Sequence, residues 1–99
     1  MIIVGRCDKL FNRCEYMVID TSNIGFMSVR NEGSVPVITF LSNGHSYTIS
    51  LHTEYLDEAV RRLVDFIIEN WRNDRVVTIK ELNEIYYEIC SSVWEERGE

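Results

Sequence analysis

The dipeptide Asn43-Gly44 lies between two stretches in which apolar and polar residues alternate, and it restricts the fold of this chain more than any other feature. Asn-Gly is the preferred pair for a two-residue type I′ turn, which joins two antiparallel strands. Such a turn fixes the register of the hairpin, so Ser42 pairs with His45. One face of the hairpin then carries mostly apolar cross-strand pairs and is predicted to face the core: Phe40 with Tyr47, Ile38 with Ile49, and Pro36 with Leu51.

The opposite face of this hairpin is more polar, and we expect it to meet solvent or the margin of another strand. Pro36 lacks a backbone donor, which predicts that its strand begins there or lies at an edge. The residues assigned to this second face are Val37, Thr39 and Leu41, opposite Ser50, Thr48 and Ser46.

Polar turns divide the residues before the hairpin into short strand-like segments. Gly33 lies in one of these turns and is free to adopt a positive φ. The predicted segments are a strand at 1–4, a loop at 5–13, a strand at 14–20, a turn at 20–23, a strand at 24–30 and a turn at 31–34.

Two amphipathic patterns follow the hairpin and predict helices at about 54–71 and 79–96. Thr53 is the expected cap of the first helix. Thr78 and Glu81 form a capping box at the second, in which the glutamate reaches back to the backbone N–H of the cap. Val77 and Leu82 are spaced as a hydrophobic staple. In the first helix, the acid and base of the pairs Asp57/Arg61 and Glu58/Arg62 are four residues apart, a spacing that allows ion pairs.

Each predicted helix has an apolar stripe that should face the core. The stripe of the first helix is Leu56, Val60, Leu63, Val64, Ile67 and Trp71. The stripe of the second is Leu82, Ile85, Tyr86, Ile89, Cys90 and Val93.

Consecutive strands followed by helices indicate an α+β fold. We predict a single domain spanning 1–99, in which an antiparallel sheet of four to five strands is followed by two C-terminal helices packed on one face. Val76 and Val77 are expected to add a brief extended segment between the helices.

The net charge of −6 is concentrated at the end of the chain, because residues 80–99 contain six acids and two bases. A duplex-binding protein normally presents a basic surface to phosphates, so we expect no direct binding to duplex nucleic acid. The excess acid fits either a solvated helix face or contact with a basic protein partner. This localised charge makes Glu81, Glu84, Glu88 and Glu95 the first predicted partner-binding residues.

The three cysteines make an odd number without a zinc-type pair of close spacings, so we expect reduced thiols and no disulfide framework. Cys14 and Cys90 occupy apolar positions. A metal site would require Cys7 and Cys14 to meet His45 or His52, which no spacing predicts. The apolar start is short and no stretch reaches membrane-spanning length, so we expect a cytoplasmic protein without membrane contact.

The chain contains no recognisable catalytic or cofactor motif, and we therefore expect no enzyme and no cofactor. His45 and His52 are expected in exposed turns. The alternatives are a nucleophile at Cys7 or Cys14, and an acid–base or divalent-ion pair at Glu84 and Glu88. Single-strand nucleic-acid binding is a further alternative, through stacking on the aromatic residues Tyr16, Phe26, Phe40, Tyr47 and Phe66.

The segment 19–68 resembles small proteins encoded by phages and prophages, some of which are built on a pleckstrin-homology-like sheet. The resemblance rests on short strands, the Ser42-Asn43-Gly44 hairpin, the Thr53-Glu54 helix start, and the stripe of Ala59 and Leu63. NGHSYTIS (residues 43–50), the helix after it and the acidic last helix also resemble anti-CRISPR inhibitors of RNA-guided nucleases.

This resemblance implies inhibition by occupancy of a basic channel. Carboxylates would stand in for the phosphates of a duplex or guide, and the partner would be a nucleic-acid-binding nuclease in the host cell cytoplasm. The partner-binding residues that the resemblance implies are Glu81, Glu84, Glu88, Glu95 and Glu96 of the last helix, with Asp74 from the connection before it. The alternative is a structural or regulatory interaction module of a phage, with a homodimer formed through the hairpin edge or through the exposed apolar part of the last helix.

Overall fold

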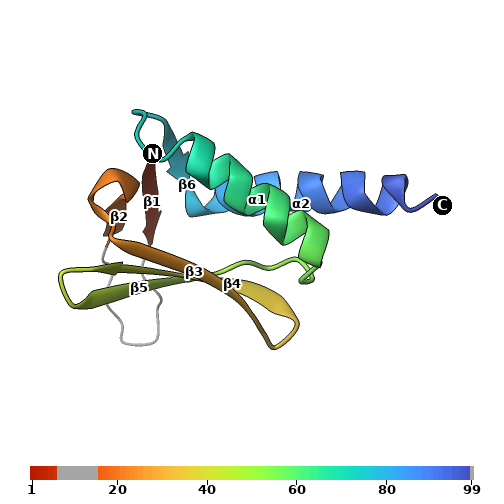
Figure 1. Cartoon of the computed structure of the whole chain (residues 1–99), viewed down its shortest axis with the longest axis horizontal. Coiled ribbons are helices and arrows are strands. Elements are labelled where there is room, and N and C mark those ends of the chain that lie inside the picture. Colours follow the sequence, from red (N-terminus) through yellow and green to blue (C-terminus); the bar gives the residue numbers. More distant parts are fainter. Residues whose placement is uncertain (7–15, 99) are drawn as a thin grey trace.

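The computed structural model describes residues 1–6 and 16–98 of the chain. Within these residues, two sheets of three strands pack with two C-terminal helices in one compact unit (Figure 1). The predicted α+β class is confirmed, although the strands are divided between two sheets instead of forming one sheet of four to five. The elements are β1 (Ile2–Arg6), β2 (Tyr16–Asp20), the 3-10 turn η2 (Thr21–Asn23), β3 (Phe26–Glu32), β4 (Val35–Ser42), β5 (His45–Ser50), α1 (Asp57–Glu69), β6 (Val76–Thr78) and α2 (Ile79–Glu96).

The first sheet has the strand order β2-β1-β6 and joins the start of the chain to the segment just before α2. Its central strand β1 pairs antiparallel with β2, where Ile3 lies opposite Ile19, and parallel with β6, where Ile3 lies opposite Val77. The predicted extended segment at Val76 and Val77 is therefore present, but as a parallel edge strand beside the chain start. Gly5, which the sequence placed in a loop, belongs to β1; the rest of the predicted loop lies mainly outside the described residues.

The second sheet has the order β3-β4-β5 and contains the predicted hairpin. Ser42 pairs with His45 as expected, and the ladder continues outward in the predicted register. Asn43 and Gly44 have φ of 50° and 82°, the signs that a type I′ turn requires. Gly33 has the expected positive φ of 63°, and it forms the turn before β4 together with Ser34. The strand predicted at 24–30 is shifted by two residues, to Phe26–Glu32.

One hydrophobic core connects both sheets to both helices. The predicted inner face of the hairpin lies in it, except that Tyr47 keeps 37% of its surface exposed. The core residues are Met1, Ile3, Ile19, Ile38, Phe40, Ile49, Leu51, Ala59, Val60, Leu63, Ile67, Val77, Leu82, Tyr86, Cys90 and Val93.

The other face of the hairpin is less open to solvent than predicted. Val37 is only 4% exposed, and the hydroxyl of Thr39 is buried without a hydrogen-bond partner among the described residues. Because β4 is the central strand, Val37 lies between Arg30 on β3 and Ser50 on β5, which flank it on both sides. Pro36 is the second residue of β4, which is the central strand of its sheet. Of the two predicted positions for this proline, it therefore lies near the start of a strand and not on an edge strand.

The amino group of Met1 fixes the chain start against the connection that follows α1. It donates to the backbone oxygens of Asn70 and Asn73, both at 2.8 Å, and to that of Trp71 at 3.1 Å. It also donates to the hydroxyl oxygen of Thr21 at 3.1 Å. These contacts hold β1, η2 and the α1–β6 connection together.

Helix α1 begins at Asp57, later than the predicted start at Glu54, and Thr53 does not cap it. The N-cap is Leu56, which has extended backbone angles. The residues before it bond to the turn and strand of the β3–β4 hairpin, with Leu51 N donating to Pro36 O at 2.9 Å and Tyr55 N donating to Ser34 O at 2.8 Å. The start of α1 is therefore set by contacts with the β3–β4 hairpin.

Candidate protein-binding face of helix α2

Helix α2 begins and ends at the residues that the sequence predicts. Its start is set by an N-cap residue that lies only three residues from its hydrogen-bond partner. Thr78 is the N-cap, and its hydroxyl oxygen accepts from Glu81 N at 3.0 Å. The carboxylate of Glu81 does not reach the backbone of the cap as predicted, and instead accepts from the Thr78 hydroxyl at 3.2 Å. Glu81 thus contributes to the helix start, and it is the first of the predicted partner-binding residues with a structural contact.

The inner side of α2 packs in the core and binds the segment that precedes α1. The Tyr86 hydroxyl donates to Glu54 O at 2.8 Å and accepts from Leu56 N at 3.1 Å. Cys90 lies one turn further along, with Sγ 3.9 Å from Glu54 O. Burial raises the pKa of the Cys90 thiol and that of the Tyr86 phenol. Cys90 is therefore a buried neutral thiol at the predicted apolar position, which disfavours a nucleophilic role.

Three of the predicted partner-binding glutamates lie together on the outer side of α2. Glu84 and Glu88 are one turn apart, and Glu95 follows Glu88 by two turns, so the three carboxylates form one row. All three are exposed, and no ion pair or side-chain hydrogen bond to another described residue involves them. Their charge is therefore open to an external partner.

Two aromatic side chains border this row of carboxylates. Tyr87 is 56% exposed and Trp94 is 37% exposed, although both are large and partly apolar. They are seven residues apart, so they project from the same side of the helix, next to the glutamates. Tyr87 was not predicted as a site residue, because helical spacing alone does not show which side of α2 the rest of the fold covers. We call Glu84, Tyr87, Glu88, Trp94 and Glu95 the acidic–aromatic face.

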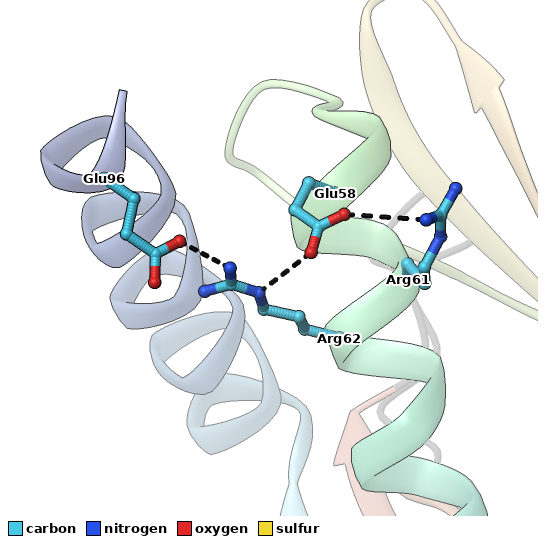
Figure 2. Close-up of polar contacts among 4 residues, drawn as sticks. All are labelled: Glu58, Arg61, Arg62 and Glu96. Carbon is cyan, nitrogen blue, oxygen red and sulfur yellow. Dashed lines mark hydrogen bonds and ion pairs between the residues drawn. The ribbon is translucent and has the colours of Figure 1, made fainter. Parts of the chain in front are cut away.

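Glu96 lies on another side of α2 and faces α1 (Figure 2). Its carboxylate binds Arg62, whose Nε also contacts Glu58 Oε1 at 3.2 Å. The hydrogen bond with Glu96 raises the pKa of Arg62. Arg61 Nη1 lies 3.7 Å from Glu58 Oε2, so Arg61 pairs with Glu58 and not with Asp57 as predicted. The predicted pair between Glu58 and Arg62 is confirmed.

Asp74 is exposed in the connection between α1 and β6. No hydrogen bond or ion pair joins it to the glutamates of α2 in the described part of the chain. The structure thus assembles Glu84, Glu88 and Glu95, assigns Glu81 to the helix cap and Glu96 to the contact with α1, and leaves Asp74 apart.

A hollow of about 490 Å³ lies beside the start of α2. Asn83 is the best-placed polar side chain in its wall, and it is already engaged: its Oδ1 accepts from His52 N at 2.8 Å and its Nδ2 donates to Ile79 O at 3.1 Å. His52 and His45 are exposed, as predicted for turn residues. Within residues 1–6 and 16–98, no three His, Cys, Asp or Glu side chains are grouped to hold a metal ion, and Cys7 and Cys14 lie outside this part of the chain.

Neither described helix combines the length and the apolar composition that crossing a bilayer requires. Comparison of the chain with protein-family models, with curated proteins and with solved structures produced no match in any of the three. The acidic–aromatic face is therefore interpreted from its own chemistry.

Proposed function

We propose that the protein is a non-enzymatic inhibitor that binds another protein through the acidic–aromatic face of α2. The observation that carries this proposal is the position of Tyr87 and Trp94 beside carboxylates that have no basic partner in the described chain. A helix face that served solubility alone would need the carboxylates but would gain nothing from two exposed aromatic rings. Aromatic anchors next to charged acceptors are typical of binding hot spots.

The chemistry of this face fits a basic partner surface. Carboxylates form strong charge-assisted hydrogen bonds with arginine and lysine, and the faces of Tyr87 and Trp94 can bind the same cations by cation–π contact. Basic surfaces of this kind normally hold phosphates. Glu84, Glu88 and Glu95 would then occupy phosphate positions, and the aromatic rings would add affinity that a row of charges alone does not provide.

The resemblance to small phage proteins supplies the class of partner. An acidic protein from a mobile element that occupies a phosphate-binding channel would inhibit a host nuclease that takes a duplex or guide RNA. In this proposal the protein acts in the host cytoplasm, without chemistry of its own and without a cofactor.

Capture from a lysate of the host cell tests this proposal when wild type and two double variants are compared. Glu84→Lys/Glu88→Lys reverses two charges on the acidic–aromatic face. Asp65→Lys/Glu69→Lys is the matched control, because it reverses two exposed acids with the same spacing on α1 and changes the net charge equally. We expect wild type and the control to retain a nucleic-acid-binding protein that short duplex DNA or guide RNA displaces, and the α2 variant to lose it.

A third variant, Tyr87→Ala/Trp94→Ala, separates specific docking from general charge attraction. We expect it to lose the partner at unchanged net charge, with a circular dichroism spectrum that shows α2 intact. Retention of the partner by all variants, loss in both charge-reversal variants alike, or failure to retain any nucleic-acid-binding protein would refute the proposal.

A further inference from the structure

We propose that the edge of β5 pairs with the β5 edge of a second copy of this chain, with Thr48 opposite Thr48 of the second copy on a two-fold axis. This interaction uses the second sheet and not helix α2, so it stands independently of the proposed function. It would join the two β3-β4-β5 sheets into one continuous antiparallel sheet.

The first observation is that β5 is an open edge without the usual protection. It lies at one side of the β3-β4-β5 sheet and has no strand neighbour beyond it within the described residues (Figure 1). Five of its six residues are exposed, all but Ile49. No Asp, Glu, Lys or Arg occurs anywhere from Gly33 to Thr53, in a chain with 26% charged residues. Natural proteins normally place charges, prolines or bulges on exposed edges to prevent pairing, so the absence of all three marks β5 as an edge that can pair.

The other sheet edges are protected in the usual ways. The opposite edge strand, β3, carries Arg30 and Glu32, whose side chains form an exposed ion pair with Nε and Oε2 2.9 Å apart. In the first sheet, the edge strand β6 is only three residues long, and β2 ends at Asp20. Among the edge strands longer than three residues, only β5 therefore has no Asp, Glu, Lys or Arg.

The hydrogen bonds between β5 and β4 determine which β5 residues have backbone N–H and C=O groups that point away from β4 and can bond to another strand. Leu51 N donates to Pro36 O, and Ser42 pairs with His45 beside the two-residue turn. In an antiparallel ladder, residues alternate between bonding inward and outward, so the odd-numbered residues bond to β4. The residues whose N–H and C=O groups point away from β4 are Ser46, Thr48 and Ser50.

Only one symmetric register brings all three outward residues into pairs. With Thr48 opposite its own copy, Ser46 lies opposite Ser50 of the second copy and Ser50 opposite its Ser46. A two-fold axis at Tyr47 would pair Ser50 with Gly44, which has φ of 82° and belongs to the turn. An axis at Ile49 would pair Ser46 with His52, which lies beyond the end of the strand.

The side chains of β5 are complementary in this same register. The sequence Ser46-Tyr47-Thr48-Ile49-Ser50 has the same chemical pattern in both directions. On the hydroxyl face, threonine meets threonine and serine meets serine. On the other face, Tyr47 meets Ile49 of the second copy, an aromatic and β-branched pair of the kind that stabilises antiparallel sheets. Tyr47 is the one aromatic side chain of the hairpin's inner face that remains exposed, which this contact would reduce.

A single strand pair is small beside the ~1,200–2,000 Å² buried by stable protein interfaces, so we expect a dimer that dissociates on dilution. Sedimentation equilibrium of the full chain over a wide concentration range measures this directly. The expected result is a mass that rises from one copy toward two copies. A mass of one copy at every concentration would overturn the proposal.

Charge substitutions at Thr48 test the register. Thr48→Lys and Thr48→Glu each place two like charges opposite one another, which we expect to weaken dimerisation by about tenfold or more, equivalent to ~1.4 kcal/mol. An equimolar mixture of the two variants should dimerise again, because lysine then faces glutamate. Ser28→Lys is the control: Ser28 lies on the same face of the sheet, on β3, and this variant should dimerise like wild type.

Each outcome of these mixtures decides the question. Rescue by mixing shows that position 48 faces its own copy and that both variants fold. Unchanged dimerisation of Thr48→Lys, loss of dimerisation in Ser28→Lys to the same extent, or monomers in the mixture would overturn the Thr48 register.

Discussion

Tyr86 of α2 donates its phenolic hydrogen to the backbone oxygen of Glu54 at 2.8 Å, across thirty-two residues of sequence. The phenolic oxygen of Tyr86 accepts from the backbone N–H of Leu56 at 3.1 Å. The Glu54 oxygen, which would accept a hydrogen bond within a helix beginning at Glu54, and the Leu56 N–H are thus both bonded by a side chain of another helix. Together with the bonds from Leu51 and Tyr55 to the β3–β4 hairpin, this contact accounts for the late start of α1.

Tyr86→Phe should lower the free energy of unfolding by about 1–3 kcal/mol, because it leaves the Glu54 oxygen and the Leu56 N–H without their partner in a partly buried place. The aromatic ring and its packing are retained, so the change isolates the hydroxyl group. Urea unfolding followed by circular dichroism measures the difference. Tyr87→Phe on the exposed side of the same helix is the control and should leave the unfolding midpoint unchanged. Equal stability of the two variants would contradict the role given to Tyr86.

The sequence predicted those parts of the fold that depend on neighbouring residues. Asn43-Gly44 sets the hairpin register through its own backbone angles, and Thr78 caps α2 through a bond three residues long. Both predictions are confirmed. The start of α1 was misplaced because the competing partners, Pro36, Ser34 and Tyr86, are far away in sequence.

The division into two sheets could not be predicted for the same reason. Strand β6 is three residues long and lies parallel to β1, more than seventy residues away in sequence. The local sequence predicts an extended segment at Val76 and Val77, but it contains no signal for the pairing of that segment with β1. At the candidate site, the acidic row was predictable from helical spacing, whereas the exposure of Tyr87 depends on where α1 and the sheets cover α2.

Thr21→Val should destabilise the protein by about 2 kcal/mol, since the Thr21 hydroxyl is a partner of a buried charged group. Its oxygen accepts from the Met1 amino group at 3.1 Å and lies 2.7 Å from Trp71 O, to which it can donate. Valine has nearly the same shape, so the loss comes from the polar contacts and not from packing. Thermal and urea unfolding should both show the decrease. A stability equal to that of wild type would mean that the remaining carbonyl oxygens suffice for the amino group.

Thr39→Val should have the opposite effect and stabilise the protein by about 1 kcal/mol. The Thr39 hydroxyl is buried on the central strand β4 and has no hydrogen-bond partner within residues 1–6 and 16–98, so its desolvation is uncompensated there. Valine keeps the β-branched shape that suits a strand and removes the unsatisfied oxygen. The same unfolding experiments compare this variant with Thr21→Val, which is the same chemical change at a satisfied hydroxyl. A decrease in stability would show that Thr39 has a partner in solution, such as an ordered water molecule.

Asp20 should make a small contribution to stability that is lost in acid. The Ser22 hydroxyl donates to Asp20 Oδ1 at 2.7 Å and the Ser22 backbone N–H at 3.1 Å, and these two bonds lower the pKa of Asp20 from its ordinary value of 3.8. A group whose pKa is lower in the folded state stabilises the fold above its unfolded pKa. This contribution is therefore complete above about pH 5 and declines as the pH falls through 3.8 and below.

Asp20→Asn isolates this effect, because the amide oxygen can still accept from Ser22 but the group cannot ionise. The variant should be slightly less stable than wild type near neutral pH, and the difference should shrink as the pH falls below about 4. Asp65→Asn on α1 is the control, since no side-chain hydrogen bond to that carboxylate occurs within the described residues. Urea unfolding midpoints between pH 2 and pH 7 give the comparison. A difference between Asp20→Asn and wild type that stays constant over this range would show that the Asp20 charge contributes nothing, and that the amide is simply a poorer acceptor for Ser22.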